Sequence, residues 1–439
     1  MTTYWLERAW TGPGPVRDGV LVEVEGGVFT SVVHGPPGDA DRLAGLTIPG
    51  LANCHSHAFH RALRGRTQRE RGTFWTWREQ MYAVAARLTP ETYFELARAT
   101  YREMVSTGIT SVGEFHYLHH GPDGTPYDDP NAMGAALVAA AGEAGIRITL
   151  LDTCYVSSAI GRPPEGVQRR FSDGDADAWA ARVSRRAATG SDGAVRRGAA
   201  IHSVRAVPRA QMPTIAAWAA DHGAPLHVHV SEQVAENEAC LEAYGATPTE
   251  VLADAGALGG RTTAVHATHL TGRDVALLGA SRTQACFCPT TERDLGDGIG
   301  PSRRLHDAGA RLTLGSDSHA VVDIFEEMRA AELDERLASR TRGHWSADEL
   351  LVAGTVDGHR SLGFDAGRIE PGAPADLVTL DVASVRTAGT GADAGTAVFA
   401  ASAADVVSVV RDGVRVADPD TRREAGLELD RVLRSLWED

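Results

Sequence analysis

The sequence contains no lysine: all 43 basic residues of the 439-residue chain are arginines. Schiff-base enzymes, pyridoxal-phosphate enzymes, P-loop NTPases and two-metal hydrolases bridged by a carbamylated lysine all require an ammonium side chain that this chain does not have. The sequence therefore excludes these classes. A metal-dependent hydrolase built on this chain is expected to be mononuclear.

Cysteine is scarce, and long apolar runs are absent. The five cysteines are odd in number and irregularly spaced, which is typical of a reduced compartment rather than of a disulfide framework. The close pair Cys286 and Cys288 is expected to pack as small apolar side chains in a buried strand.

No apolar run is long enough to span a bilayer, and the first residues lack the basic-then-apolar order of a secretory signal. We expect a cytoplasmic protein that does not bind membranes.

Positive charge is also in deficit, because the formal net charge is -15. Such a surface repels the phosphates of nucleic acid, so no nucleic-acid partner is expected. An acidic small molecule remains compatible with this charge, since individual arginines in a pocket can bind carboxylates through paired N–H donors. Specific arginines therefore become candidates for substrate recognition.

The chain has enough apolar residues, 43%, to bury a large core. Strand-like apolar runs alternate with helical patterns such as 91–106, 131–144 and 209–221, each of which precedes a glycine. Eight strand candidates are present: the run before His55, 110–115, 147–151, 199–202, 226–230, 262–266, 283–288 and 311–316. Alternation of this kind predicts an α/β fold, a (β/α)8 barrel of the TIM type.

Both ends of the chain have a different pattern, that of short strands joined by turns. Strand candidates are 20–24, 28–33, 376–381, 406–410 and 414–416, and Arg411-Asp412-Gly413 is a hairpin signal. We expect the two ends to pack together as one small β domain. The predicted division is 1–48 and 366–439 for the small domain and 49–365 for the barrel.

Candidate metal ligands stand at the ends of the strand-like runs. His55 and His57 would share one face of an extended strand, and His229, His266 and Asp317 each lie at the end of a later strand-like run. In a (β/α)8 barrel these strand ends meet at the active site. Imidazoles with one carboxylate suit Zn²⁺ or a similar ion with an open position for water, so the pattern predicts metal-assisted hydrolysis. Asp317 alone also fits a helix cap.

Eight segments of the sequence match motifs of one known family. They are His55-Ser56-His57-Ala58-Phe59, Phe74-Trp75-Thr76-Trp77-Arg78-Glu79, Glu114-Phe115-His116-Tyr117, His202-Ser203-Val204-Arg205-Ala206-Val207, His229-Val230-Ser231-Glu232-Gln233, His266-Ala267-Thr268-His269, Cys288-Pro289-Thr290-Thr291-Glu292 and Gly315-Ser316-Asp317-Ser318-His319. Through these segments, and over nearly its whole length, the sequence resembles the amidohydrolase superfamily, and within it the iminohydrolases of N-formimino-L-glutamate. The resemblance implies a metal-containing (β/α)8 barrel, a β-sandwich formed from both chain ends, and a homodimer.

The resemblance also implies roles for individual residues. One Zn²⁺ ion would be held by His55, His57, His229 and Asp317. Asp317 would transfer the proton of the attacking water, Glu232 would hydrogen-bond the imino nitrogen, and His266 would orient the water. The two carboxylates of the substrate would be bound by His60, Arg78, Tyr117, His202 and Arg205. The products would be N-formyl-L-glutamate and ammonia, in histidine degradation.

Position 60 departs from the pattern, since the resemblance implies glutamine where this chain has His60. Imidazole can donate to a carboxylate as an amide does, so the pocket can retain its function with a changed preference for side-chain length. The nearby His116, His119 and His120 are interpreted as polar lining or surface rather than as metal ligands. Two other functions stay open: a deaminase of the same superfamily acting on guanine or cytosine, and an inactive barrel that serves as a binding protein.

Overall fold

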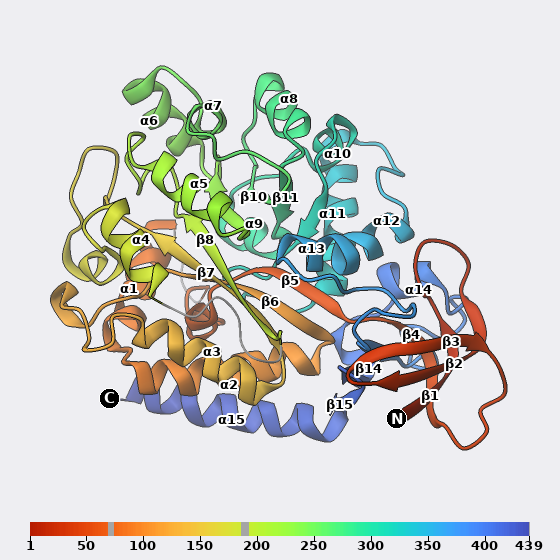
Figure 1. Ribbon diagram of the computed structural model, residues 1–439. Coiled ribbons are helices and arrows are strands. Elements are labelled where there is room, and N and C mark those ends of the chain that lie inside the picture. Colours follow the sequence, from red (N-terminus) through yellow and green to blue (C-terminus); the bar gives the residue numbers. More distant parts are fainter. Residues whose placement is uncertain (69–73, 186–192, 439) are drawn as a thin grey trace.

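The computed structural model describes residues 1–68, 74–185 and 193–438 (Figure 1). Its larger sheet has eight strands, all parallel, in chain order. The strands are β5 (Leu51–Ser56), β6 (Ile109–His116), β7 (Arg147–Cys154), β8 (Val195–Ile201), β9 (Leu226–Val230), β10 (Thr262–His266), β11 (Gln284–Phe287) and β12 (Leu312–Leu314). This arrangement confirms the predicted (β/α)8 barrel.

The first and last strands of the larger sheet meet just beyond β12. Ser56 and Asp317 form a parallel bridge, and the backbone N–H groups of Ser316 and Asp317 donate to the His55 carbonyl at 3.1 and 3.0 Å. Gly315 permits this approach, because a Cβ there would lie 2.8 Å from the Cβ of His55. The closure places the first and last strands, and the polar residues at their carboxyl ends, side by side.

Helices surround the sheet and follow its strands. Standard signals set their ends: Thr89 caps α2 ahead of a first-turn proline, and Gly145 ends α3 in the left-handed conformation with φ 77°. The helices are α1 (Phe74–Arg87), α2 (Pro90–Ser106), α3 (Ala132–Ala144), α4 (Ala176–Ser184), α5 (Met212–Asp221), α6 (Val234–Tyr244), α7 (Pro248–Asp254), α8 (Gly272–Ala280), α9 (Pro289–Leu295), α10 (Ser302–Ala308), α11 (Ile324–Ser339), α12 (Ala347–Val352), α13 (Gly358–Ser361), α14 (Ala394–Phe399) and α15 (Pro419–Glu438). The short 3₁₀ segments η1 (Ala58–Leu63), η2 (Pro122–Gly124), η3 (Gly166–Phe171) and η5 (Ala403–Asp405) and the π turn η4 (Ala353–Asp357) complete the set.

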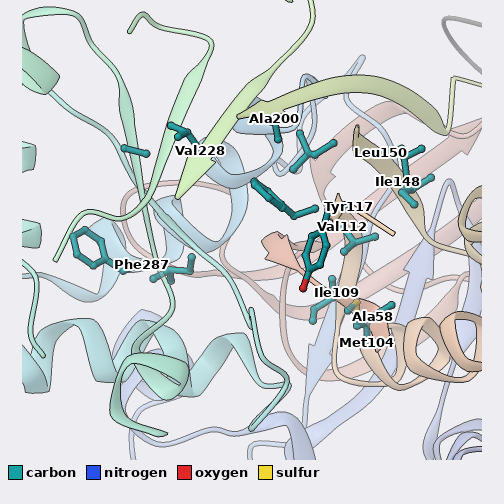
Figure 2. Close-up of a cluster of buried hydrophobic side chains, with 14 of the residues drawn as sticks. Ala58, Met104, Ile109, Val112, Tyr117, Ile148, Leu150, Ala200, Val228 and Phe287 are labelled. Carbon is teal, nitrogen blue, oxygen red and sulfur yellow. The ribbon is translucent and has the colours of Figure 1, made fainter. Parts of the chain in front are cut away.

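The main core lies between the barrel strands and the helices that cover them. Strands β6 and β7 are buried along their whole length, as expected where helices cover one face of a parallel sheet and packed side chains the other. Figure 2 shows part of this core, with labelled side chains from four barrel strands: Ile109, Val112, Ile148, Leu150, Ala200 and Val228. The strands that end at the site are thereby held in a rigid setting.

The second sheet combines strands from both ends of the chain, as the sequence predicts. Seven mixed strands run in the order β15-β14-β13-β4-β1-β2-β3. They are β1 (Thr2–Ala9), β2 (Arg17–Glu25), β3 (Val28–His34), β4 (Asp41–Pro49), β13 (Leu377–Leu380), β14 (Val406–Arg411) and β15 (Val414–Ala417). A buried ion pair ties this sheet to the barrel, because Arg147 at the start of β7 contacts Asp376 and Asp412.

Helix α15 follows β15 and leaves the second sheet. It runs along α2 on the outside of the barrel, as Figure 1 shows. The sequence analysis did not single out this helix. Among the described residues, no helix has both the length and the apolar character needed to cross a membrane.

Candidate active site

One cavity opens at the carboxyl ends of the barrel strands. The residues that line it include all three predicted catalytic residues, three of the four predicted metal ligands and all five predicted substrate-binding residues, with Asp317 counted both as catalytic residue and as ligand. Those residues are His57, His60, Arg78, Tyr117, His202, Arg205, His229, Glu232, His266 and Asp317. The remaining predicted ligand, His55, is fully buried at the end of β5. The fold therefore collects side chains that are far apart in the sequence into one site.

Three imidazoles and one carboxylate converge at one side of this cavity. One donor atom from each of His55, His57, His229 and Asp317 lies within 4.8 Å of the others. Nε2 of His55 and Nε2 of His57 each lie 3.3 Å from Oδ1 of Asp317, and the Nε2 atoms of His55 and His229 are 3.0 Å apart. Three nitrogen donors and one oxygen donor fit a divalent cation with an open coordination position.

The protonation of these groups also suits cation binding. Nδ1 of His57 lies 2.9 Å from the Phe115 carbonyl, so it carries the proton and leaves the Nε2 lone pair to face the cluster. Burial lowers the pKa of His55 to about 3 and that of His229 well below its usual value, so both rings are neutral at neutral pH. Burial alone would raise the pKa of Asp317, but interactions with the adjacent His55 and His57 rings outweigh burial and hold that pKa well below its usual value.

The backbone is strained where three strands reach the site. Ser231 after β9, His266 at the end of β10 and Asp317 after β12 have φ values of 53°, 68° and 38°, although none is glycine. The left-handed conformation costs such residues free energy that the surrounding structure must supply. His266 and Asp317 line the cavity, and Ser231 directly precedes Glu232, which also lines it.

Glu232 and His266 each contact a second charged residue. Nη2 of Arg205 donates to Oε2 of Glu232 at 3.2 Å. Nδ1 of His266 lies 3.4 Å from Oε1 of Glu292, and its Nε2 lies 3.7 Å from Oδ2 of Asp317. A ring held between two carboxylates is fixed in orientation, and it presents Nε2 to the same side as the metal-ligand cluster.

The predicted substrate-binding residues surround the rest of the cavity. Nε2 of His60 lies 3.0 Å from the Tyr117 hydroxyl, and both residues are buried. The His202 ring packs edge to face against the Tyr155 ring, with their centroids 4.8 Å apart. Arg78 reaches the cavity from α1. Two arginines from separate elements thus face one space, and each can bind a carboxylate.

The three histidines at and just after the end of β6 correct the sequence interpretation. We expected polar lining or surface, but His116, His119 and His120 are buried and none lines the cavity. Nδ1 of His119 lies 3.3 Å from Nε2 of His116, and its Nε2 lies 2.8 Å from the Thr153 carbonyl. The adjacent Asp152 accepts hydrogen bonds from Arg182, which neutralises its charge. These residues therefore belong to an internal hydrogen-bond and ion-pair network, in which one donor atom from each of His116, His119 and Asp152 also lies within 4.8 Å of the others.

All five cysteines are free and buried, and Cys286 and Cys288 pack with Cys54 in a small apolar cluster, as predicted. Sγ of Cys288 also lies within 4.8 Å of donor atoms of His266 and Asp317. Sequence reasoning missed other residues: Glu292 received no role although its motif was recognised, and Tyr82 and Tyr155, which line the cavity, were not singled out. No local pattern distinguishes these residues from ordinary core or surface residues.

A family model for the amidohydrolase family matches residues 46–416. The chain belongs to the amidohydrolase family. It is 37% identical to the formimidoylglutamate deiminase of Pseudomonas aeruginosa over 87% of this chain and 86% of that protein. It is 30% identical to the 8-oxoguanine deaminase of the same organism, over 85% and 82%. An amidohydrolase from Brucella melitensis has a similar crystal structure, with a TM-score of 0.89, 31% identity, and coverage of 99% and 100%.

Membership of the amidohydrolase family, together with the similarity to a formimidoylglutamate deiminase, identifies the protein as a hydrolase that acts on carbon–nitrogen bonds. The barrel and the second sheet from both chain ends agree with that assignment. The histidine and aspartate cluster supports binding of a divalent metal ion in this amidohydrolase.

Proposed function

We propose that this amidohydrolase hydrolyses the formimino group of N-formimino-L-glutamate, giving N-formyl-L-glutamate and ammonia, as a step of histidine degradation. Water adds to the formimino carbon, the C=NH nitrogen leaves as ammonia, and the carbon keeps the oxygen as a formyl group. The observation that carries the proposal is the cavity that joins the cluster of His57, His229 and Asp317 to two arginines. The similarity to the Pseudomonas aeruginosa formimidoylglutamate deiminase supports the same substrate.

The metal ion is proposed to be one Zn²⁺ per chain, held by His55, His57, His229 and Asp317. When bound, such an ion supplies Lewis acidity that lowers the pKa of water to about 7. The donor set supports this choice because imidazoles with one carboxylate match the borderline character of zinc.

The remaining steps belong to side chains of the chain itself. Asp317 accepts the proton of the attacking water and later delivers it to the departing nitrogen. Glu232 hydrogen-bonds the imino nitrogen and orients it, and Arg205 holds the Glu232 carboxylate in place at 3.2 Å. His266, held between Glu292 and Asp317, orients the water and stabilises negative charge on the adding oxygen.

Binding of the substrate is assigned to donors around the cavity. Arg205 lies beside Glu232 and therefore close to the reacting carbon, which suits the α-carboxylate. Arg78, on α1, is placed to bind the side-chain carboxylate. His60, Tyr117 and His202 complete the wall, and the His60–Tyr117 hydrogen bond holds the Tyr117 phenol in place.

The test is ammonia release by the purified, zinc-loaded enzyme, with metal content determined on the same sample. N-formimino-L-glutamate is compared with N-formimino-L-aspartate, guanine and cytosine. We expect rapid turnover of N-formimino-L-glutamate with one metal per chain. Turnover of guanine or cytosine in its place would favour the aromatic-base deaminase, and absence of turnover in all four would favour a binding role for the barrel.

A further inference from the structure

Two tyrosines of the cavity are held by a single buried amide. Nε2 of Gln168, in η3, donates to the Tyr82 hydroxyl at 2.9 Å and to the Tyr155 hydroxyl at 3.0 Å. Tyr82 lies on α1 and Tyr155 follows β7, and both line the cavity. The three residues belong to separate elements, so their meeting is a property of the tertiary structure.

The orientation of the amide is fixed from its other end. The backbone N–H of Glu165 donates to Oε1 of Gln168 at 3.1 Å, so the oxygen of the amide faces its own loop and the NH₂ group faces the phenols. Each phenol oxygen is therefore an acceptor toward Gln168, and each keeps its own O–H proton as a donor. Burial raises the pKa of Tyr155 well above its usual value, so that proton is retained.

Among the described residues, neither O–H donor has an acceptor. Across residues 1–68, 74–185 and 193–438, Gln168 is the only hydrogen-bond partner of either hydroxyl. Tyr155 is also held in place, because its ring packs edge to face against His202 and Phe171 with centroids 4.8 and 5.4 Å away. Tyr155 is buried and Tyr82 is partly buried. Hydroxyl donors in such positions normally find an acceptor, so a ligand oxygen is the expected partner.

The charges around these hydroxyls indicate the kind of ligand. The guanidinium carbon of Arg78 lies 5.7 Å from the centroid of the Tyr82 ring. The charges of Arg205 and Arg78 both act on Tyr155 and oppose the rise in its pKa. Two neutral O–H donors beside a guanidinium form a site for an oxyanion with several acceptor lone pairs, which a carboxylate provides.

We propose that Tyr82 and Tyr155, oriented by Gln168, donate their hydroxyl protons to the side-chain carboxylate of the substrate and so select a dicarboxylate. This inference rests on the proposed function. Arg205 is held beside Glu232 and so lies near the reacting group. Arg78 lies beside Tyr82, so Arg78 and the two phenols are placed to bind the side-chain carboxylate, which is farther from the reacting carbon. A shorter substrate would not reach the phenols, and a substrate with an amide in place of the carboxylate would lose the charge they bind.

The experiment compares Tyr82→Phe, Tyr155→Phe and the double variant with the wild-type enzyme. With N-formimino-L-glutamate, we expect KM to rise about tenfold or more for the double variant, since a hydrogen bond to a charged group is lost at each position. We expect kcat to change by less than about threefold, because the reacting atoms are not touched. With N-formimino-L-glutamine, which lacks the side-chain charge, the same variants should change KM little.

Tyr127→Phe is the matched control, because the Tyr127 hydroxyl contacts Arg170 at 3.5 Å and does not line the cavity. Metal content and Tm of each variant report folding. Gln168→Met, which keeps the length of the side chain and removes the amide, should raise KM in the same direction as the double variant.

Glutarate binding, measured by calorimetry, separates failure of this inference from failure of the proposed function. If the wild-type enzyme is inactive on N-formimino-L-glutamate but binds glutarate more tightly than the double variant does, the carboxylate site stands and the proposed reaction falls. If the wild-type enzyme turns over N-formimino-L-glutamate and the double variant has an unchanged KM and unchanged glutarate affinity, the assignment of the two phenols is overturned.

Discussion

The imidazole of His266 is held by the carboxylate of Glu292, with Nδ1 and Oε1 3.4 Å apart. The same oxygen of Glu292 accepts the backbone N–H of Cys288 at 2.9 Å, which anchors the carboxylate at the start of α9. Nδ1 of His266 therefore faces a carboxylate that is itself anchored, and Nε2 of the same ring is directed toward Asp317. A histidine that must orient a water molecule requires such a partner.

Glu292→Gln is expected to lower kcat by about 10- to 100-fold with KM little changed, because a neutral amide holds the His266 ring less firmly. Steady-state kinetics on N-formimino-L-glutamate measure both constants, and metal analysis checks that the ligand cluster is intact. Glu424→Gln, on the exposed side of α15, is the control and should behave as wild type. Unchanged kcat in the Glu292 variant would show that the contact has no part in the reaction.

Arg205→Met is expected to spare the metal and to reduce kcat/KM strongly. The substrate would lose a bidentate partner in a largely enclosed cavity, an effect of roughly 2 to 4 kcal/mol, or about 30- to 700-fold. Arg209→Met removes a guanidinium from the same segment, where it pairs with Asp254 at the surface, and serves as the control. Kinetics indistinguishable from wild type in the Arg205 variant would remove this residue from substrate binding.

His229→Ala is expected to lose both bound metal and activity, since one of the converging nitrogen donors is removed. Added Zn²⁺ should raise the Tm of the metal-free wild-type protein but not that of the variant, because a ligand stabilises only a state that binds it. His222→Ala, at the end of α5, is the control. A fully active His229 variant with a full complement of metal would contradict the ligand assignment.

The contribution of two buried histidines, His227 and His359, to the free energy of unfolding is expected to fall as the pH falls from about 6.5 toward 4. Burial lowers the pKa of His227 and of His359 to about 4 in the folded state, although a hydrogen bond to a carbonyl opposes it in each case. Unfolded histidine has a pKa of about 6.5, so in this window the unfolded state binds more protons at these two positions, and their contribution to stability rises with pH.

Urea unfolding at several pH values tests this expectation. His359→Asn should reduce the dependence of the unfolding free energy on pH between about 6.5 and 4 by nearly one proton, or about 1.4 kcal/mol per pH unit at most. Equal slopes for wild type and the His359 variant would mean that His359 is protonated equally in both states.

Much of the fold follows from local patterns in the sequence. The strand from Leu226 to Val230 and the strand from Thr262 to His266 lie where the apolar runs predict them, and α3 ends at Gly145 as expected. Backbone hydrogen bonding and burial of near neighbours determine such elements, so their signals are local. The position of histidine and aspartate directly after strands also predicted which end of the barrel carries the site.

Other features depend on contacts between distant elements. The sequence placed His55 and Asp317 after the first and last strands, but the bridge between Ser56 and Asp317 is formed only when the barrel closes around a glycine at 315. The docking of α15 on α2 likewise has no local signal, because the apolar face of a helix does not specify which surface covers it.

The sequence by itself determined the barrel, the joining of both chain ends in one sheet, and the set of side chains available for metal-assisted hydrolysis. Only the tertiary structure decided which of those side chains touch: Glu292 with His266, and Gln168 with Tyr82 and Tyr155. It also decided that the histidines after β6 are buried in a network of their own. Side-chain contacts of this kind depend on the packing of whole elements against one another, and no short segment of sequence contains that information.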